Sequence, residues 1–158
     1  MNLPENFKIV VVGATAAADS VTYDTISCKD ALKVWFIVSH IGDSDTDCTL
    51  SLVESTDVAN STTTAVTATF PIWVNKTVNL SGDTLTKQTD AASYSINTTT
   101  ATERDQLVVI EWDPAKFSSG YDCIQLADTG GNNSNNITAL AIIETRYPQA
   151  TPPTVITD

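Results

Sequence analysis

Short segments rich in Thr, Val, Ile and aromatic residues alternate along the chain with clusters of Gly, Asp, Asn and Ser. Strands favour β-branched and aromatic side chains, and the clusters hold the residue types that form turns. Apolar residues rarely recur at the i, i+3, i+4 and i+7 spacing of an amphipathic helix. The pattern therefore predicts an all-β protein. The expected strands cover residues 7–12, 21–28, 31–41, 48–54, 65–74, 91–96, 106–112, 121–127 and 136–145.

Two of these segments are apolar without interruption, over residues 34–38 and 107–110. A strand with one face in water alternates instead, as Cys48–Leu52 does. An unbroken apolar strand is expected where a second sheet covers one face and a loop or neighbouring subunit covers the other. Eight or nine short strands without a repeat predict a two-sheet antiparallel sandwich with jelly-roll or Greek-key topology. Residues 113–117 are expected to form one connecting helical turn, because Pro follows a capping Asp.

We divide the chain into an N-terminal arm (1–8), a sandwich domain (9–147) and a Pro-rich C-terminal tail (148–158). The prolines of the tail preclude a helix and favour an extended path. The tail is either a frayed terminus or an arm that lies on a partner subunit. The second interpretation is suggested by Val155 and Ile156, which would be costly to leave in water.

Acidic residues outnumber basic ones. The 158 residues include 19 Asp and Glu against 8 Lys and Arg, which gives a formal net charge of −11. Repulsion at this charge argues against nucleic-acid partners and against docking on an anionic membrane surface. No apolar run approaches the ~20 residues of a membrane span. The N-terminus lacks the features of a signal peptide, so we expect the chain to stay in the cytoplasm in which it is made.

The cysteines Cys28, Cys48 and Cys123 stand far apart and form no CxxC pair. An odd number at this spacing indicates neither a disulfide framework nor a zinc site. Each lies in an apolar or alternating segment, so we predict three buried free thiols. No cofactor is expected.

His40 is the single histidine of the chain. Its neighbour Ser39 cannot serve it as a nucleophile, because adjacent strand residues point to opposite faces. The sequence has no GxSxG elbow, no HExxH helix and no Gly-rich phosphate loop. No pair of acidic residues stands out by its spacing. We therefore interpret His40 as a structural residue and expect a protein that is not an enzyme.

An acidic segment follows residue 42, and it partly matches a calcium-binding loop. Asp43, Asp45 and Asp47 occupy the first three odd ligand positions, and Glu54 occupies the twelfth. However, Cys48 replaces the glycine of the sharp turn, and an extended strand would carry Glu54 away from the aspartates. We interpret the segment as a solvated turn. Weak Ca²⁺ binding by the three aspartates is the alternative hypothesis.

Three tryptophans raise the question of aromatic binding surfaces. Trp35 lies within an unbroken apolar strand and is expected to be buried. Trp73 alternates away from Ile72 and Val74, so it is free to face outward. We interpret Trp73 as an interface residue, because Trp is enriched at protein interfaces. The alternative is a platform on which sugar rings stack.

Four stretches spread over most of the chain share a pattern with one known family. They are Ala16–Asp24, Ala31–Val38, Trp112–Ala115 together with Gly120–Leu126, and Ala139–Pro148. In these stretches the chain resembles the jelly-roll decoration, or cement, proteins on the heads of tailed bacteriophages. The resemblance implies a non-enzymatic structural virion protein that binds the outer surface of a phage head and stabilises the capsid lattice.

The resemblance also implies partners and a location. The expected partners are the major capsid protein and other copies of the chain, as a homo-oligomer with a trimer favoured. The expected location is the capsid exterior, after assembly in the host cytoplasm. The candidate interface residues are Leu3, Phe7, Trp73, Tyr147, Pro152, Val155 and Ile156. The alternatives are a phage tail or baseplate component and a carbohydrate-binding β-sandwich module.

Overall fold

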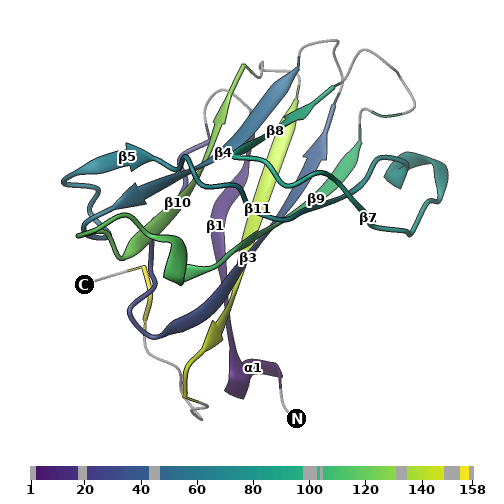
Figure 1. Ribbon diagram of the computed structural model, residues 1–158. Coiled ribbons are helices and arrows are strands. Elements are labelled where there is room, and N and C mark those ends of the chain that lie inside the picture. Colours follow the sequence, from purple (N-terminus) through teal and green to yellow (C-terminus); the bar gives the residue numbers. More distant parts are fainter. Residues whose placement is uncertain are drawn as a thin grey trace.

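In the computed structural model, two antiparallel sheets pack face to face (Figure 1). The structure describes residues 3–17, 21–42, 47–97, 103, 105–130, 135–147 and 154–156. Sheet A contains, in spatial order, β1 (Phe7–Ala17), β11 (Asn136–Thr145), β3 (Ala31–Ile41), β9 (Gln106–Trp112), β6 (Ile72–Asn75) and β7 (Thr86–Lys87). Sheet B contains β2 (Ile26–Ser27), β10 (Cys123–Thr129), β4 (Cys48–Ser55) and β5 (Thr63–Ala65), and β8 (Ser93–Ile96) also pairs with β4. The predicted two-sheet antiparallel sandwich is confirmed.

From β1 to β4, and again from β8 to β11, each strand lies in the opposite sheet from the strand before it. β1, β3, β9 and β11 belong to sheet A, whereas β2, β4 and β10 belong to sheet B. Each crossing brings the apolar side of one strand against the apolar side of the next, so sequence neighbours build opposite walls of one core. This order is compatible with a jelly roll, and that finer assignment stays a prediction.

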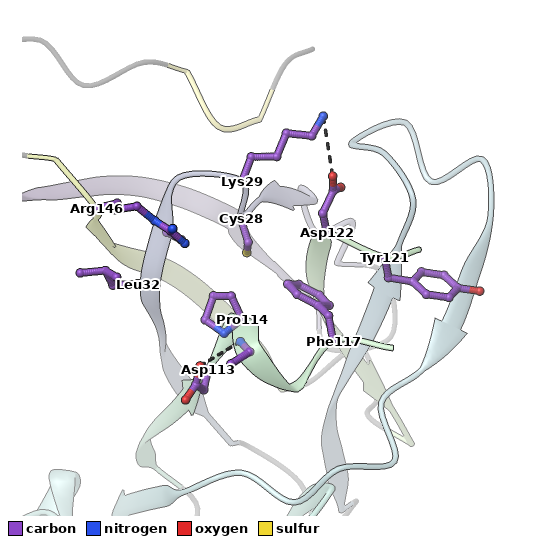
Figure 2. A pocket seen from close by; sticks show the side chains of 11 residues that line it. Cys28, Lys29, Leu32, Asp113, Pro114, Phe117, Tyr121, Asp122 and Arg146 are labelled. Carbon is purple, nitrogen blue, oxygen red and sulfur yellow. Dashed lines mark hydrogen bonds and ion pairs between the residues drawn. The ribbon is translucent and has the colours of Figure 1, made fainter. Parts of the chain in front are cut away.

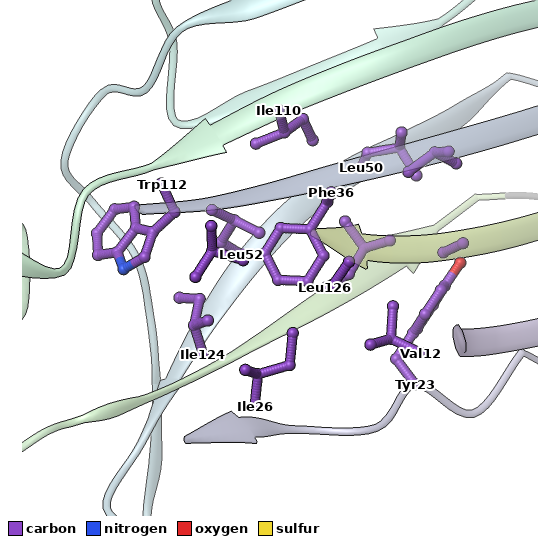
Figure 3. Close-up of a cluster of buried hydrophobic side chains, with 14 of the residues drawn as sticks. Val12, Tyr23, Ile26, Phe36, Leu50, Leu52, Ile110, Trp112, Ile124 and Leu126 are labelled. Carbon is purple, nitrogen blue, oxygen red and sulfur yellow. The ribbon is translucent and has the colours of Figure 1, made fainter. Parts of the chain in front are cut away.

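The core lies between the sheets (Figure 3). Phe36 and Trp112 of sheet A and Leu52 and Ile124 of sheet B are all fully buried there. Complete burial of one such side chain stabilises the fold by about 1.5–3 kcal/mol. Phe117 adds an edge-to-face contact with Trp112, with ring centroids 5.4 Å apart. The unbroken apolar strands β3 and β9 therefore give every second side chain to this core.

The expected strand over residues 65–74 is divided in the structure. β5 ends at Ala65, and β6 begins at Ile72. Between them Pro71 has no N–H to donate to a ladder, and Phe70 makes only an isolated bridge to Ala91. The expected strand over residues 21–28 likewise shortens to the two residues of β2.

Both ends of the chain join the sandwich more closely than predicted. A helical turn, α1 (Leu3–Asn6), leads into β1, so Phe7 and Lys8 belong to a strand and not to an arm. Near the C-terminus, Val155 is buried in the core with 9% of its surface exposed. The amide of Ser27 donates to the Val155 carbonyl at 2.7 Å. The segment 154–156 therefore covers the edge of sheet B at β2.

Short helical turns occur in two connections, η1 (Val78–Leu80) and η3 (Pro114–Lys116). The predicted turn after Trp112 is confirmed by η3. Asp113 caps the start of this turn, because its Oδ1 accepts a hydrogen bond from the Ala115 amide at 2.9 Å. In the described parts of the chain, no helix is long and apolar enough to cross a membrane.

Candidate interaction surface

The outer side of sheet A carries a continuous band of apolar side chains. Strand pairing sets the outward residues in rows, because the side chains of paired residues lie on the same face of a sheet. One row runs through Ile9, Ile142, Trp35 and Glu111, and the next through Val11, Leu140, Ile37, Val109 and Trp73. We define the apolar face as the apolar members of these rows: Ile9, Val11, Trp35, Ile37, Trp73, Val109, Leu140 and Ile142. It crosses five adjacent strands.

The apolar face is open to solvent in this chain. On β3, Val34, Phe36 and Val38 are fully buried, whereas Trp35 and Ile37 between them are only partly buried. Exposure increases at the edge strand β1, where Ile9 is 43% and Val11 is 54% exposed. From the spacing of strands and residues, the face has a flat footprint of roughly 250 Å². This footprint is close to the size of the largest apolar patch on an ordinary monomer, and such patches are often functional.

Charged residues at one margin of the apolar face are paired with one another. Lys33 bonds to Oε1 of Glu111, and the indole Nε1 of Trp35 donates to Oε2 of Glu111 at 3.0 Å. The hydrogen bond with Glu111 raises the pKa of Lys33. Glu144 lies beside Lys33 in the same ladder. This margin is therefore polar but close to neutral.

The acidic charge of the protein lies away from sheet A. The strands of this sheet contain Lys8, Lys33 and Lys87 against Glu111 and Glu144, a net charge of +1 in a chain whose net charge is −11. The excess of Asp and Glu therefore lies in sheet B, the connections and the ends. A partner that approaches the apolar face meets little of the acidic charge.

The outer side of sheet B has the opposite chemistry. Its outward residues, which we call the polar face, are Thr49, Ser51, Val53, Ala65, Ser93, Ser95, Gln125, Ala127 and Thr129. The hydroxyl groups of Thr49 and Ser95 lie 2.9 Å apart and bond to each other. Small hydroxyl side chains interact well with water, so this face needs no partner to cover it.

Two predicted interface residues lie on the outer side of sheet A. Trp73 belongs to the apolar face, with the Lys87 ammonium 5.9 Å from its ring centroid. Phe7 packs against Trp35, with ring centroids 6.2 Å apart and planes inclined at 56°. The prediction that Trp35 is buried was wrong, because it alternates with Val34 and Phe36 and must face outward when they face the core. That alternation was the signal that could have revealed the apolar face.

The other predicted interface residues belong to the chain ends. Leu3, Tyr147 and Ile156 are exposed, Val155 is buried in its own core, and Pro152 lies outside the described residues. Val155 would be available to a partner only if its segment detached from β2. We call Leu3, Tyr147 and Ile156 the terminal residues.

Hydrogen bonds bring the chain ends to one end of the sandwich. The hydroxyl of Thr145 donates to the carbonyl of Asn6 at 3.3 Å. The next amide, that of Arg146, donates to the carbonyl of Asp30 at 2.7 Å. The segment around Val155 joins the same region through Ser27. Helix α1, the end of β11 and the C-terminal segment therefore lie near one another.

The candidate calcium ligands fall partly outside the described residues. Asp43 and Asp45 lie there, and Asp47 is exposed at the start of β4. Glu54 is buried on the inner side of sheet B, where its carboxylate oxygens accept from the Ser118 amide at 3.1 and 3.3 Å. Glu54 is thus held by a structural bond. Among the described residues, no group of three or more His, Cys, Asp or Glu side chains is placed to hold a metal.

A cleft of about 390 Å³ lies beside η3 at the end of the sandwich that holds the chain ends (Figure 2). Cys28 and Arg146 line it, and at its margin Lys29 and Asp122 form an ion pair of 3.8 Å. Burial strongly raises the pKa of the Cys28 thiol, so the sulfur is protonated at neutral pH and is a poor nucleophile. Cys28, Cys48 and Cys123 are all free and buried, as predicted.

His40 lies on the inner side of β3, and Ser39 is exposed on the other side, as alternation predicts. The neighbour of His40 in the ladder, Gln106, is also buried, and it accepts from the Tyr94 hydroxyl at 3.1 Å. Burial raises the pKa of Tyr94 to about 12, so the hydroxyl stays protonated as the donor at neutral pH. These polar residues fill one end of the core.

No protein family and no curated protein sequence matches the chain. Among solved structures, it is similar to the SPBc2 prophage-derived protein YomS, with a TM-score of 0.45 and 8% identity over 87% of this chain and 92% of that one. A putative sugar binding protein from Bacteroides thetaiotaomicron gives a TM-score of 0.36 and 7% identity over 82% and 71%. The Tobacco streak virus coat protein gives 0.25 and 12% identity over 97% and 95%. The neighbours thus include a prophage-derived protein, a viral coat protein and a putative sugar binding protein.

Proposed function

We propose that this chain is a structural virion protein that binds the outer surface of a phage head and stabilises the capsid lattice, without acting as an enzyme. The observation that supports membership of an assembly is the apolar face. The core between the sheets is complete, yet a second set of Trp, Ile, Val and Leu side chains lies outside it. Such a surface is stabilised when another protein covers it, as in an assembly.

The two outer faces suit a protein fixed on a shell. The apolar face supplies a contact within the assembly, and the polar face, with its small hydroxyl groups, is suited to the surrounding water. The acidic charge keeps free copies soluble before assembly. Many copies on one lattice reinforce each other, because each bound copy holds its neighbours at a high effective concentration.

We assign the contact with the major capsid protein to the terminal residues. Leu3, Tyr147 and Ile156 expose apolar surface at the end of the sandwich near α1, the end of β11 and the segment 154–156. This assignment leaves the apolar face for contacts between copies. A capsid contact through these three residues also requires no change in β1 or in the core contact of Val155.

The test is co-sedimentation of the full chain with undecorated phage heads. We expect stoichiometric binding that saturates. The triple variant Leu3→Ser, Tyr147→Ser and Ile156→Ser is expected to weaken binding at least about tenfold. Each substitution removes apolar contact area whose burial contributes roughly 1 kcal/mol or more to the binding free energy.

The matched control changes exposed apolar residues elsewhere. Val78→Ser, Leu80→Ser and Leu85→Ser alter residues that are 46%, 56% and 42% exposed, and this variant is expected to bind heads as the unmodified chain does. If the full chain fails to bind heads and sediments with phage tails instead, the capsid assignment is wrong and the tail or baseplate alternative replaces it.

The carbohydrate-binding alternative is favoured by one observation, the presence of two tryptophans on the apolar face. Two others oppose it, because Lys87 lies over the Trp73 ring and Phe7 is inclined to Trp35. A sugar platform requires an accessible aromatic plane. Titration with soluble glycans should leave the tryptophan fluorescence unchanged, and a saturable change would favour the carbohydrate-binding function.

A further inference from the structure

We infer that the apolar face is covered by the same face of a second copy of this chain, with sheet A packed against sheet A about a two-fold axis. The inference rests on the proposed function and names the partner of one of its surfaces. It follows from the charge, the area and the row pattern of the outer side of sheet A.

The charge distribution selects a neutral, apolar partner. The outward charged residues in the strands of sheet A are Lys33, Lys87, Glu111 and Glu144, whose charges cancel, although the chain carries −11. A strongly basic partner would be attracted to the acidic connections and not to this face. A second copy presents the required surface, and its acidic connections lie outside the contact.

The whole outer side of sheet A is somewhat smaller than a standard dimer interface, and the apolar face forms the central part of it. Five strands spaced about 4.8 Å apart, each with about 25 Å of length, give an outer side of roughly 600 Å². A standard interface buries about 800 Å² on each partner, and homodimer interfaces are more apolar than the average surface. Side chains that project from the sheet add to this flat area, and so do the flanking residues Phe7 and Leu107. The accessible area of the outer side of sheet A therefore approaches that of a standard interface.

The rows allow two copies to meet without facing like charges. On one side of the apolar face lies the row of Lys33 and Glu144, and on the other lies the uncharged row of Ser39 and Thr138. A two-fold axis that runs along the rows within the interface places the row of Lys33 and Glu144 against the row of Ser39 and Thr138. The same rotation packs the row of Trp35 and Glu111 against the row of Ile37 and Val109, so Glu111 of one copy faces Val109 of the other.

A face that packs on its own copy closes with two chains. The trimer that the resemblance favours would therefore need another surface. The mass of the full chain in solution separates the two arrangements, and it is measured by sedimentation velocity over a range of concentrations. We expect a monomer–dimer equilibrium.

The test variant is Val109→Glu. Val109 lies between Ile37 and Trp73 in the apolar face and is partly buried. The matched control is Val53→Glu, which places the same charge on a partly buried valine of the polar face, between Gln125 and Ala65. We expect Val109→Glu to raise the dimer dissociation constant at least about thirtyfold, because the two-fold axis places each new carboxylate against Glu111 of the other copy, and Val53→Glu to leave it unchanged.

A milder pair of variants covers the case in which Val109→Glu does not fold. Val109→Cys and Val53→Cys each add one surface thiol to a chain whose own cysteines are buried. Maleimide should modify Val109→Cys slowly at high protein concentration and faster after dilution. The rate for Val53→Cys should not depend on concentration. Equal behaviour of the two variants, or a monomer at all concentrations, would overturn the inference.

Co-sedimentation with heads separates this inference from the proposed function. A chain that is monomeric in solution but binds heads stoichiometrically contradicts the dimer and leaves the capsid function standing. A dimer that depends on Val109 but fails to bind heads contradicts the capsid function and leaves the dimer standing. A trimer that is insensitive to Val109→Glu overturns the face-to-face pairing.

Discussion

The two outer faces of the sandwich are built by the same kind of strand, yet they carry opposite side chains. On β3 the outward positions hold Trp35 and Ile37, whereas on β4 they hold Thr49 and Ser51. Both strands bury their inward residues completely in one core. Sheet B shows that hydroxyl side chains outside are compatible with a packed core. The apolar side chains outside sheet A are therefore not required by the fold, and they indicate a contact that the single chain does not make.

The largest expected effect is on stability, and it differs between substitutions on the inner and the outer side of β3. Phe36→Ala empties a fully buried position and should lower the free energy of unfolding by about 3–5 kcal/mol. Ile37→Ala removes a side chain from the open side and should cost less than about 1.5 kcal/mol in the monomer. Urea denaturation at low protein concentration measures both values. Similar losses for the two variants would mean that the apolar face is already covered within the chain.

An intermediate effect is expected when the polar face is made apolar. The double variant Thr49→Val and Ser51→Val should associate into species larger than a dimer, because each molecule would then have two adhesive faces. Light scattering at increasing concentration measures the growth in mass. The control Thr49→Ser and Ser51→Thr keeps the hydroxyl groups and should behave as the unmodified chain. Unchanged mass for the valine variant would show that an outward apolar patch alone does not drive association.

The smallest effect concerns the charged margin of the apolar face. The bond to Glu111 raises the pKa of Lys33, so it stabilises the folded state below the ordinary lysine pKa and is lost as the pH rises through the raised value. Glu111→Gln should therefore lower stability at pH 8, and lower it by less at a second pH well above the ordinary lysine pKa. The difference should stay below about 1 kcal/mol, since the Lys33 side chain is 39% exposed and water screens the pair. Thermal melts of both chains at the two pH values measure it.

Most strands could be predicted from the sequence because their signals are local. Alternation in Cys48–Leu52 and the unbroken apolar segments gave β4, β3 and β9 nearly at their observed bounds. The cap at Asp113 gave η3 for the same reason, since one side chain and the next two residues define it. Pro71 could have indicated that the expected strand over residues 65–74 is divided. The apolar residues on both sides of it predicted a continuous strand instead.

The surfaces were harder to predict, because they depend on which strands pair. Trp35 was expected in the core, since an apolar run does not show which of its alternate residues faces the second sheet. Trp73 was predicted correctly to face outward. Its neighbours Ile72 and Val74 are clearly core residues, and alternation then directs Trp73 to the opposite side of the strand. That the two tryptophans share one face follows only from the register of β3, β9 and β6. The burial of Val155 depends on a contact with β2, more than a hundred residues earlier.

The confinement of acidic charge to the connections, the ends and sheet B affects how fast copies meet. Two molecules that each carry −11 repel one another at long range. The repulsion is greatest when the acidic connections approach and smallest when the strands of sheet A approach. Side-on encounters are therefore favoured over end-on ones, and added salt should speed the encounter by shortening the range of the repulsion. The same charge that keeps free copies apart would thus orient them for the contact between copies that we propose for the apolar face.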